Sequence, residues 1–155
     1  MLAPMLIAAI ITSGLLAGFF FAYWCSVMIG LRKVSDATFV ETMQEINASL
    51  PNARFAIPFF APVVLTAIST WLAFAGDEST AAWWSAGATI LAVITFGITA
   101  SQNVPMNNTL AEAGRSDDSA AREAFEIPWT RWNDIRTLTS TLTFVASVMA
   151  LFSLD

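Results

Sequence analysis

Charged residues are missing from four long stretches of the chain, residues 1–31, 55–76, 79–111 and 137–154, and are concentrated in the segments between them. Each uncharged stretch can hold a helix of roughly 18–25 residues, enough to cross a hydrocarbon layer about 30 Å thick. Because lipid offers the backbone no hydrogen-bond partners, internally bonded helices are the economical structure there. The pattern predicts an all-α fold: one integral membrane domain of residues 1–155, a bundle of four transmembrane helices at about 4–31, 56–75, 82–102 and 134–154.

The first loop between spans has a different pattern, typical of a short amphipathic helix. Thr38 and Glu41 form a capping-box pattern, and Pro51 is placed to end the element. Its apolar positions share one face: Phe39, Met43, Ile46 and Leu50. We expect this helix to lie on the membrane surface or over the mouth of the bundle. A second short helix is expected at 120–126, with Pro128 in the first turn of the helix that follows.

Small residues recur every four positions along the first predicted span. They are Gly14, Gly18, Ala22, Ser26 and Gly30. A second stripe of small residues on the fourth span, Thr139, Thr143, Ser147 and Ala150, is placed to meet it. Small residues at this spacing let two helices approach closely, so the first stripe predicts helix packing within the bundle.

The seven Lys and Arg residues predict the orientation in the membrane. They lie only between the first and second spans (Arg32, Lys33, Arg54) and between the third and fourth (Arg115, Arg122, Arg131, Arg136). We expect the protein to lie in the plasma membrane. By the positive-inside rule, both termini should then face outward and both long loops should face the cytoplasm. The N-terminus lacks a basic region, and its apolar run is too long for a cleaved signal peptide.

Composition narrows the possible chemistry. The net charge of −5 argues against a nucleic-acid partner, and the single cysteine, Cys25, cannot form an intrachain disulfide. There is no histidine, which excludes haem held by histidine, histidine-based metal sites and Ser-His catalysis. We therefore expect no histidine-based metal site, and the expectation of no cofactor rests on the family resemblance given below.

The polar residues before the fourth span are the main candidate site. On a helix, Trp129, Trp132, Asn133 and Arg136 share one face at spacings of three and four. Arg136 is the last charged residue before the hydrocarbon stretch. A guanidinium at this depth usually faces a bundle interior or a water-filled cavity, where it can stabilise a phenolate or enolate. The structural alternative is that Arg136 extends to the lipid headgroups and the tryptophans form an interface belt.

Three residues from other spans fall at a similar depth. Asn103 and Asn107 flank Pro105 at the end of the third span, and Tyr23 lies near the end of the first. The amides either satisfy helix carbonyls freed by the proline or point into the bundle mouth and hold a ligand oxygen. The candidate catalytic residues are Arg136, Asn133 and Asn103, and the candidate substrate-binding residues are Trp132, Trp129, Asn107 and Tyr23.

Four segments, 18–23, 38–47, 103–107 and 131–136, resemble in order and spacing the anthrone oxygenase-like family of small four-helix membrane proteins. The Asn-Val-Pro-Met-Asn stretch and the Arg-Trp-Asn-Asp-Ile-Arg stretch are its most specific parts. The resemblance implies oxidation of an anthrone to an anthraquinone by dioxygen, with no metal or flavin. Asn103, Asn107, Trp132, Asn133 and Arg136 are the positions it marks as site-like.

Two functions follow as hypotheses. The first is a cofactor-free oxygenase, embedded in the lipid bilayer, that acts on a lipophilic, electron-rich aromatic ligand, with Arg136 and amides stabilising its oxyanion and Glu126, Asp134 or water as the base. The second is a non-enzymatic accessory subunit that packs with a protein partner or as a homo-oligomer in the membrane. A small transporter is a weaker hypothesis, because no span has a charge near its middle.

Overall fold

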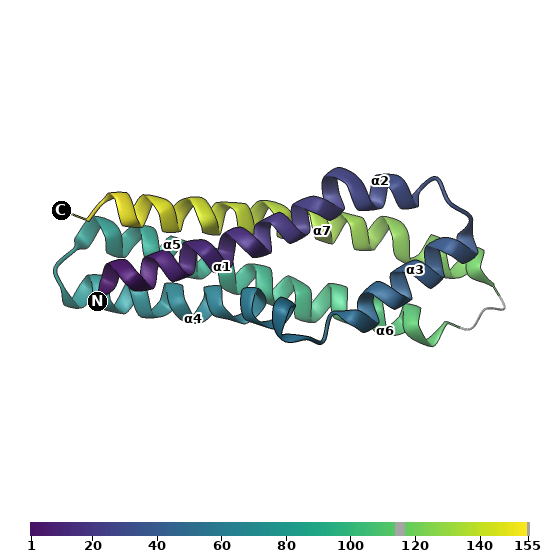
Figure 1. Ribbon diagram of the computed structural model, residues 1–155, viewed down its shortest axis with the longest axis horizontal. Helices are drawn as coiled ribbons and strands as arrows, with labels where there is room; N and C mark the ends of the chain where they lie inside the picture. Colours follow the sequence, from purple (N-terminus) through teal and green to yellow (C-terminus); the bar gives the residue numbers. More distant parts are fainter. Residues whose placement is uncertain (114–116, 155) are drawn as a thin grey trace.

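The computed structural model describes residues 1–113 and 117–154, and within them every regular element is a helix. Arg115, used above for orientation, and Asp155 lie outside the described residues. Four helical columns lie side by side, and the second is shorter than the others (Figure 1). The first is α1 (Leu2–Ala22), the π-helical turn η1 (Tyr23–Val27) and α2 (Met28–Leu31); the second is α4 (Ala53–Ala75). The third is α5 (Ser79–Ile98), the π-helical turn η2 (Thr99–Asn103) and α6 (Val104–Glu112); the fourth is α7 (Asp118–Phe152).

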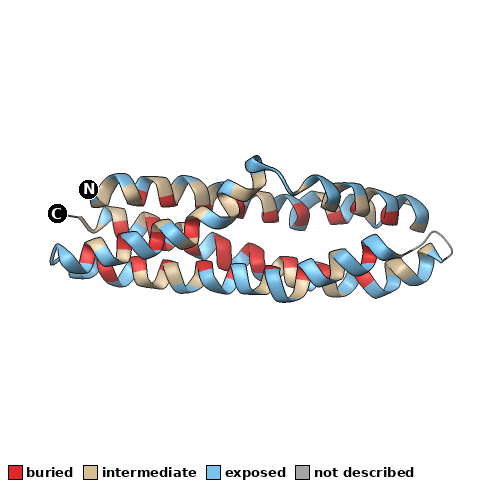
Figure 2. Cartoon of the chain, turned by 90° about the horizontal axis from the view of Figure 1, so that it is seen from below, coloured by how far each residue is buried: buried red, intermediate tan, exposed pale blue. Residues whose placement is uncertain are grey.

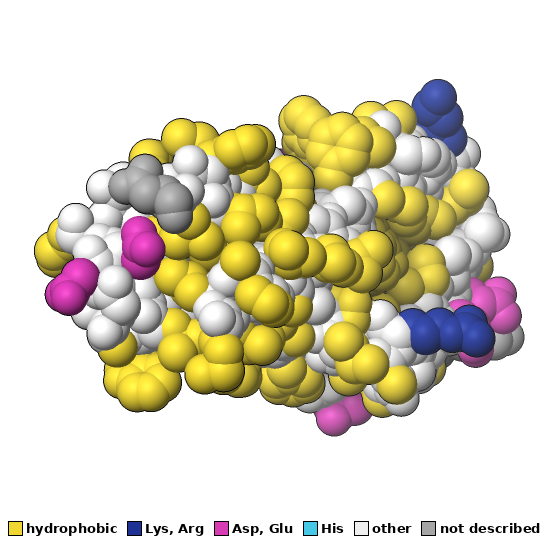
Figure 3. All heavy atoms as spheres, turned by 60° about the vertical axis from the view of Figure 1, so that its left-hand side comes forward, with side chains coloured by type: hydrophobic (Ala, Val, Ile, Leu, Met, Phe, Trp, Pro, Cys, Tyr) yellow, Lys and Arg dark blue, Asp and Glu magenta, His cyan; other side chains and the backbone are white. Residues whose placement is uncertain are grey.

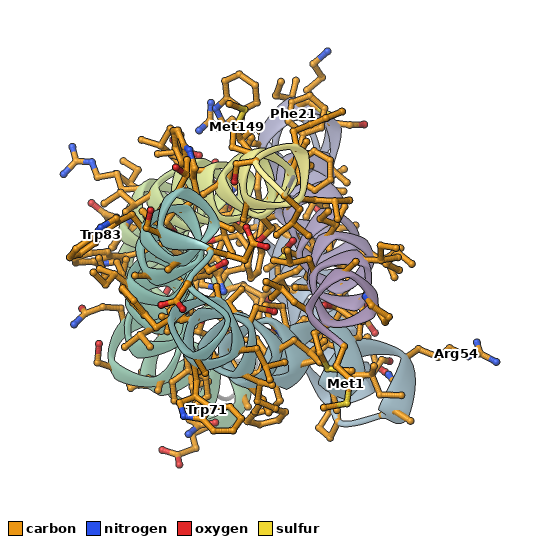
Figure 4. All side chains as sticks on the ribbon, turned by 90° about the vertical axis from the view of Figure 1, so that its left-hand side faces the viewer. Met1, Phe21, Arg54, Trp71, Trp83 and Met149 are labelled. Atoms are coloured by element: carbon orange, nitrogen blue, oxygen red, sulfur yellow. The ribbon has the colours of Figure 1, made fainter. Side chains whose placement is uncertain are left out.

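The columns close into a ring in which α1 and α5 each pack against both α4 and α7. Buried residues face the centre of the ring, and the outward faces are exposed (Figure 2). Viewed end-on, Phe21, Trp71, Trp83 and Met149 point away from the bundle (Figure 4). All four columns are long and apolar enough to cross a membrane. Charged side chains gather near the ends of the molecule, with a hydrophobic band between them (Figure 3). The chain is a multi-pass membrane protein built as a four-helix bundle.

Both termini lie at one end of the bundle, together with the turn between α4 and α5 (Figure 1). The opposite end carries α3 (Asp36–Ser49), which packs against α6 and α7. We call these the terminal end and the α3 end. As the apolar pattern predicted, α3 buries Phe39 and Met43 completely, and it covers the mouth of the bundle. The cap, however, is Ser35, whose hydroxyl accepts a hydrogen bond from the N–H of Thr38, so the predicted cap at Thr38 was wrong by three residues.

Two side-chain networks hold α3 in place. Arg122 of α7 donates to Asp36 and to the carbonyls of Leu31, Arg32 and Val34, and it also pairs with Glu126. Gln44 of α3 donates to the carbonyl of Leu110 at 2.7 Å. The first network binds the loop before α3 to α7, and the second binds α3 to α6.

Two expectations about the helices were wrong. Pro128 does not begin a helix: α7 runs unbroken from Asp118, so the proline lies ten residues inside it. The stripe of small residues on the first column mostly faces outward, because Gly18, Ala22, Ser26 and Gly30 are exposed. The face of α1 that packs in the bundle is instead Leu6, Ala9, Ser13, Leu16, Ala17 and Phe20. Four of the five small residues thus share the outward face, so their spacing did not distinguish a face that packs within the bundle from one that faces out.

Candidate functional site

One face of α7 carries three buried residues at helical spacing: Trp129, Asn133 and Arg136. The guanidinium of Arg136 is only 4% exposed, so Arg136 faces inward and does not extend to the lipid headgroups. Trp132, predicted on the same face, is half-buried and lies outside the cavity described below. Position 132 is also three residues from 129 and four from 136, so it lies at the edge of this face, and the rotation of α7 in the bundle leaves it outside the cavity.

The contacts of Arg136 leave its charge uncompensated within the described part of the chain. Nη2 donates to the Asn133 amide oxygen at 3.2 Å, and Nη1 lies 3.5 Å from the Thr99 hydroxyl. Its Cζ lies 4.3 Å from the centre of the Phe20 ring and 5.3 Å from that of Trp129. Among the described residues, no carboxylate forms an ion pair with it and Nε has no hydrogen-bond partner. A buried cation held only by neutral groups is costly, and an anionic ligand would relieve that cost.

Neighbouring residues hold the guanidinium in place. The Asn133 side chain accepts from Arg136 with its oxygen and donates to the Phe20 carbonyl of α1 at 3.2 Å, so it links the two columns. The Trp129 indole donates to the Asn107 amide oxygen of α6 at 2.8 Å. The Tyr23 ring lies 5.3 Å from the Trp129 ring. Residues from α1, α6 and α7 are thereby brought together at one level of the bundle.

Both π-helical turns lie at this level. In η1 the N–H of Met28 bonds to the carbonyl of Tyr23, and in η2 the N–H of Val104 bonds to that of Thr99, each five residues back. Such wide turns are rare and are often found at functional sites. The turn in η2 immediately precedes Pro105, which cannot donate and whose ring clashes with a regular preceding turn. The sequence predicted a stop or kink at Pro105; the structure accommodates it by widening the helix instead.

A cavity of about 430 Å³ opens beside Arg136, and we call it the inner cavity. Seven of its nineteen lining residues are aromatic, and its polar groups come from Arg136, Tyr23, Thr99 and the amides of α3 and α6. The lining residues are Phe19, Phe20, Tyr23, Gln44, Asn47, Ala48, Leu50, Pro51, Phe55, Ala56, Phe59, Phe60, Thr99, Val104, Asn107, Asn108, Ala111, Trp129 and Arg136. A mostly apolar cavity of this size with a few convergent polar groups is typical of a small-molecule site.

The other predicted site residues lie as follows. Asn107, Trp129 and Tyr23 line the inner cavity together with Arg136, and Asn133 lies behind the guanidinium. Asn103 is 1% exposed in η2, does not line the cavity, and neither of its amide atoms has a partner among the described residues. The two carboxylates considered as bases also lie outside the cavity. Glu126 pairs with Arg32 and Arg122, and Asp134 faces a separate hollow between η1, α2 and α7.

Sequence reasoning missed Phe20 and Thr99, the two residues that contact the guanidinium from neighbouring columns. Phe20 stands in a run of three phenylalanines, where nothing in the sequence indicates which ring faces inward. Thr99 looks like any other hydroxyl residue in an apolar span. Within the described residues, no group of three or more His, Cys, Asp or Glu side chains is placed to hold a metal ion.

Comparison with known proteins adds one match. The sequence model of the anthrone oxygenase family matches residues 53–146, which include α4, α5, α6 and most of α7. No curated protein and no solved structure matches the chain. The matched region covers more than half of the sequence and contains Asn103, Asn107, Trp129, Asn133 and Arg136. The chain belongs to the anthrone oxygenase family.

Proposed function

We propose that the protein is a cofactor-independent oxygenase that oxidises a lipophilic, anthrone-type aromatic in the inner cavity. One observation carries the proposal: the buried, unpaired guanidinium of Arg136 on the wall of an aromatic-lined cavity. A planar aromatic with an acidic oxygen fits both features, because its rings match the walls and its oxyanion supplies the missing negative charge. The family supports this class of substrate.

The reaction needs little from the protein beyond charge stabilisation. Loss of a proton from the CH₂ group of an anthrone gives a carbanion whose charge is delocalised onto the ring oxygen. The carbanion reduces dioxygen and forms a C–O bond to it, giving a peroxide anion, which takes back the proton lost in the first step and becomes a hydroperoxide. Breaking the O–O bond with loss of the second hydrogen releases one water and leaves the second carbonyl of the quinone. An arginine next to the ring oxygen stabilises the first anion and so favours the initial proton loss.

The proposed roles follow from the contacts. Arg136 holds the oxyanion, and Asn133 orients the guanidinium. Trp129, fixed by Asn107, and Tyr23 supply aromatic surface for the ring system, and the Tyr23 hydroxyl has no hydrogen-bond partner among the described residues. Because Glu126 and Asp134 lie outside the cavity, water entering from its mouth is the proton acceptor we favour. The scheme gives Asn103 no role, because its amide has no partner among the described residues and does not line the cavity.

Orientation and location belong to the same proposal. The Lys and Arg residues favour a plasma-membrane protein with both termini outside, which places the α3 end and the inner cavity at the cytoplasmic face. A substrate that partitions into the bilayer then meets the site at the depth where hydrocarbon gives way to headgroups.

Oxygen uptake with anthrone tests the proposal on purified full-length protein in detergent or nanodiscs. We expect uptake above the rate of spontaneous oxidation, with anthraquinone as product, and a loss of about 10²–10³-fold in Arg136→Ala. Arg131→Ala removes an exposed arginine on the same helix and should leave the rate unchanged. Equal rates for wild type and Arg136→Ala would remove Arg136 from the mechanism, and no rate above background would reject anthrone as substrate.

A further inference from the structure

A second and larger cavity, about 540 Å³, lies next to the inner cavity, and we call it the outer cavity. It lies between α1, α3 and the first turns of α4. The two cavities share four lining residues: Phe19, Tyr23, Leu50 and Phe55. Only side chains therefore separate the outer cavity from the space beside Arg136.

The shared wall consists largely of two aromatic rings that meet across the gap between α1 and α4. The centres of the Phe19 and Phe55 rings are 5.2 Å apart, and Phe19 lies at the same distance from the Tyr23 ring. Both phenylalanines are only half-buried, so neither is fixed on all sides. Rotamer changes of such rings are fast compared with helix movement. A change of rotamer at Phe19 or Phe55 would join the two cavities without moving the backbone.

The position of the outer cavity fits a ligand that comes from the bilayer. Its wall includes Leu15 on α1 and Pro58 on α4, both within uncharged stretches, and Leu15 is 60% exposed on the outer face of α1. The opposite rim carries Glu45 and Arg54, both exposed charges. Arg54 points away from the bundle in the end-on view (Figure 4). The cavity thus extends from lipid-facing residues to the charged edge of the membrane region.

The inner cavity has a different rim. On the side of α3 and α6 it carries the amides of Gln44, Asn47 and Asn108. Amide groups are hydrated more favourably than aliphatic or aromatic side chains, so water suits this side. A lipophilic substrate suits the apolar wall between α1 and α4.

We propose that the outer cavity is a second binding site, a vestibule that takes a neutral, planar polycyclic aromatic from the bilayer between α1 and α4. The ligand then passes Phe19 and Phe55 to reach Arg136. This proposal rests on the proposed function for the identity of the ligand. It adds a binding site, a route and two gating side chains to that function.

Photo-crosslinking tests the vestibule directly. The probe is a diazirine-bearing anthraquinone, added to full-length protein in phospholipid nanodiscs, with crosslinked peptides identified by mass spectrometry. We expect crosslinks competed by plain anthraquinone at both Ile46, which lines only the outer cavity, and Ala111, which lines only the inner one. Crosslinks at the inner cavity alone would overturn the vestibule and leave the proposed function standing. Crosslinks at the outer cavity alone would support the vestibule and count against the inner site, and competed crosslinks at neither would overturn both.

Two neighbouring residues of α3 provide a matched kinetic test. Ser49 lines the outer cavity, Ala48 lines the inner cavity, and both are exposed. Ser49→Trp should slow association of anthraquinone by about tenfold with little change in the dissociation constant, because a narrowed passage slows entry and exit alike. Ala48→Trp should raise the dissociation constant, because it occupies the final site. A wild-type association rate in Ser49→Trp would overturn the proposed route.

Discussion

The two halves of the bundle differ in the size of their buried side chains. At the terminal end the buried residues are small, among them Ala9, Ala73, Ala81, Ala82, Ser85, Ala88, Ser147 and Ala150. At the α3 end they are large and aromatic, including Phe20, Tyr23, Phe39, Phe125 and Trp129. Between the halves, the central space shrinks to about 10 Å³ beside Ser13 and Thr143, compared with about 430 Å³ in the inner cavity.

Polar groups follow the same division. At the terminal end, several hydroxyls bond to carbonyls of their own helices: Ser13 donates to the carbonyl of Ala9 at 2.6 Å, and Ser147 to that of Thr143 at 2.8 Å. The hydroxyls of Thr70 and Thr89 lie 3.1 Å apart and link α4 to α5. These groups let the helices approach closely. At the α3 end, the large rings leave spaces between them, and the Arg136 guanidinium has spare hydrogen-bonding capacity facing one of these spaces. One half is closely packed, and the other contains the inner cavity.

The largest expected effect tests whether Arg136 serves function at the cost of stability. Arg136→Leu should reduce anthrone oxidation by about 10²–10³-fold, because the oxyanion loses its donor. The same change should leave the free energy of unfolding unchanged or raise it by about 1–4 kcal/mol, because it removes an uncompensated buried charge. Oxygen uptake and thermal unfolding in the same detergent measure both. A strongly destabilised variant would mean that the neutral partners already satisfy the guanidinium.

The next effect concerns how the α3 end is held together. Arg122→Gln should lower the free energy of unfolding by about 2 kcal/mol, because it leaves Asp36 and three carbonyls without their charged donor and leaves Glu126 with Arg32 alone. It should also speed hydrogen exchange in α3 before the rest of the bundle opens. Arg54→Gln, at an exposed position, is the control for lost charge. Uniform exchange throughout the chain would show that α3 does not open as a unit.

Substitution by a larger side chain should lower the free energy of unfolding more in one half of the bundle than in the other. Ala9→Leu should cost about 1–3 kcal/mol of unfolding free energy, because Ala9 is completely buried where helices meet. Ala48→Leu, at the rim of the inner cavity, should change it by less than about 0.5 kcal/mol. Thermal unfolding of the two variants side by side measures the difference. Equal costs would show that the cavity rim is as tightly constrained as the terminal core.

The smallest effect compares two glycines one turn apart on α1. A methyl group on Gly18 would meet no atom within 4 Å, whereas one on Gly14 would lie 3.2 Å from the Phe144 ring. Gly18→Ala should therefore stabilise the protein by about 0.5–1 kcal/mol by removing backbone freedom from the unfolded state. Gly14→Ala should gain less or lose stability, because the ring has to move. A larger gain at Gly14 would show that the Phe144 ring shifts freely.

The sequence alone determined that the protein is a bundle of four membrane-spanning helices. It also identified Arg136, the most unusual residue of the candidate site. Hydrocarbon imposes helices on uncharged stretches of that length, so four columns and their order followed from the distribution of charge. Arg136 was identifiable because a guanidinium next to hydrocarbon needs a partner or a cavity. The spacing of Trp129, Asn133 and Arg136 was also readable, because helical periodicity is local.

Only the tertiary structure decided which neighbours these residues meet. Tyr23 and Thr99 each begin a π-helical turn. Such a turn adds one residue to the helical period and shifts the faces that follow it, and no periodic pattern in the sequence indicates where this happens. Phe20 faces the guanidinium, whereas Phe21 points to lipid, although both stand in the same run of rings. Trp132 was assigned to the polar face but lies outside the cavity, because the packing of α7 against its neighbours fixes its rotation. Cavities arise where large side chains from several columns fail to fill the space between them, and that depends on distances no single helix specifies.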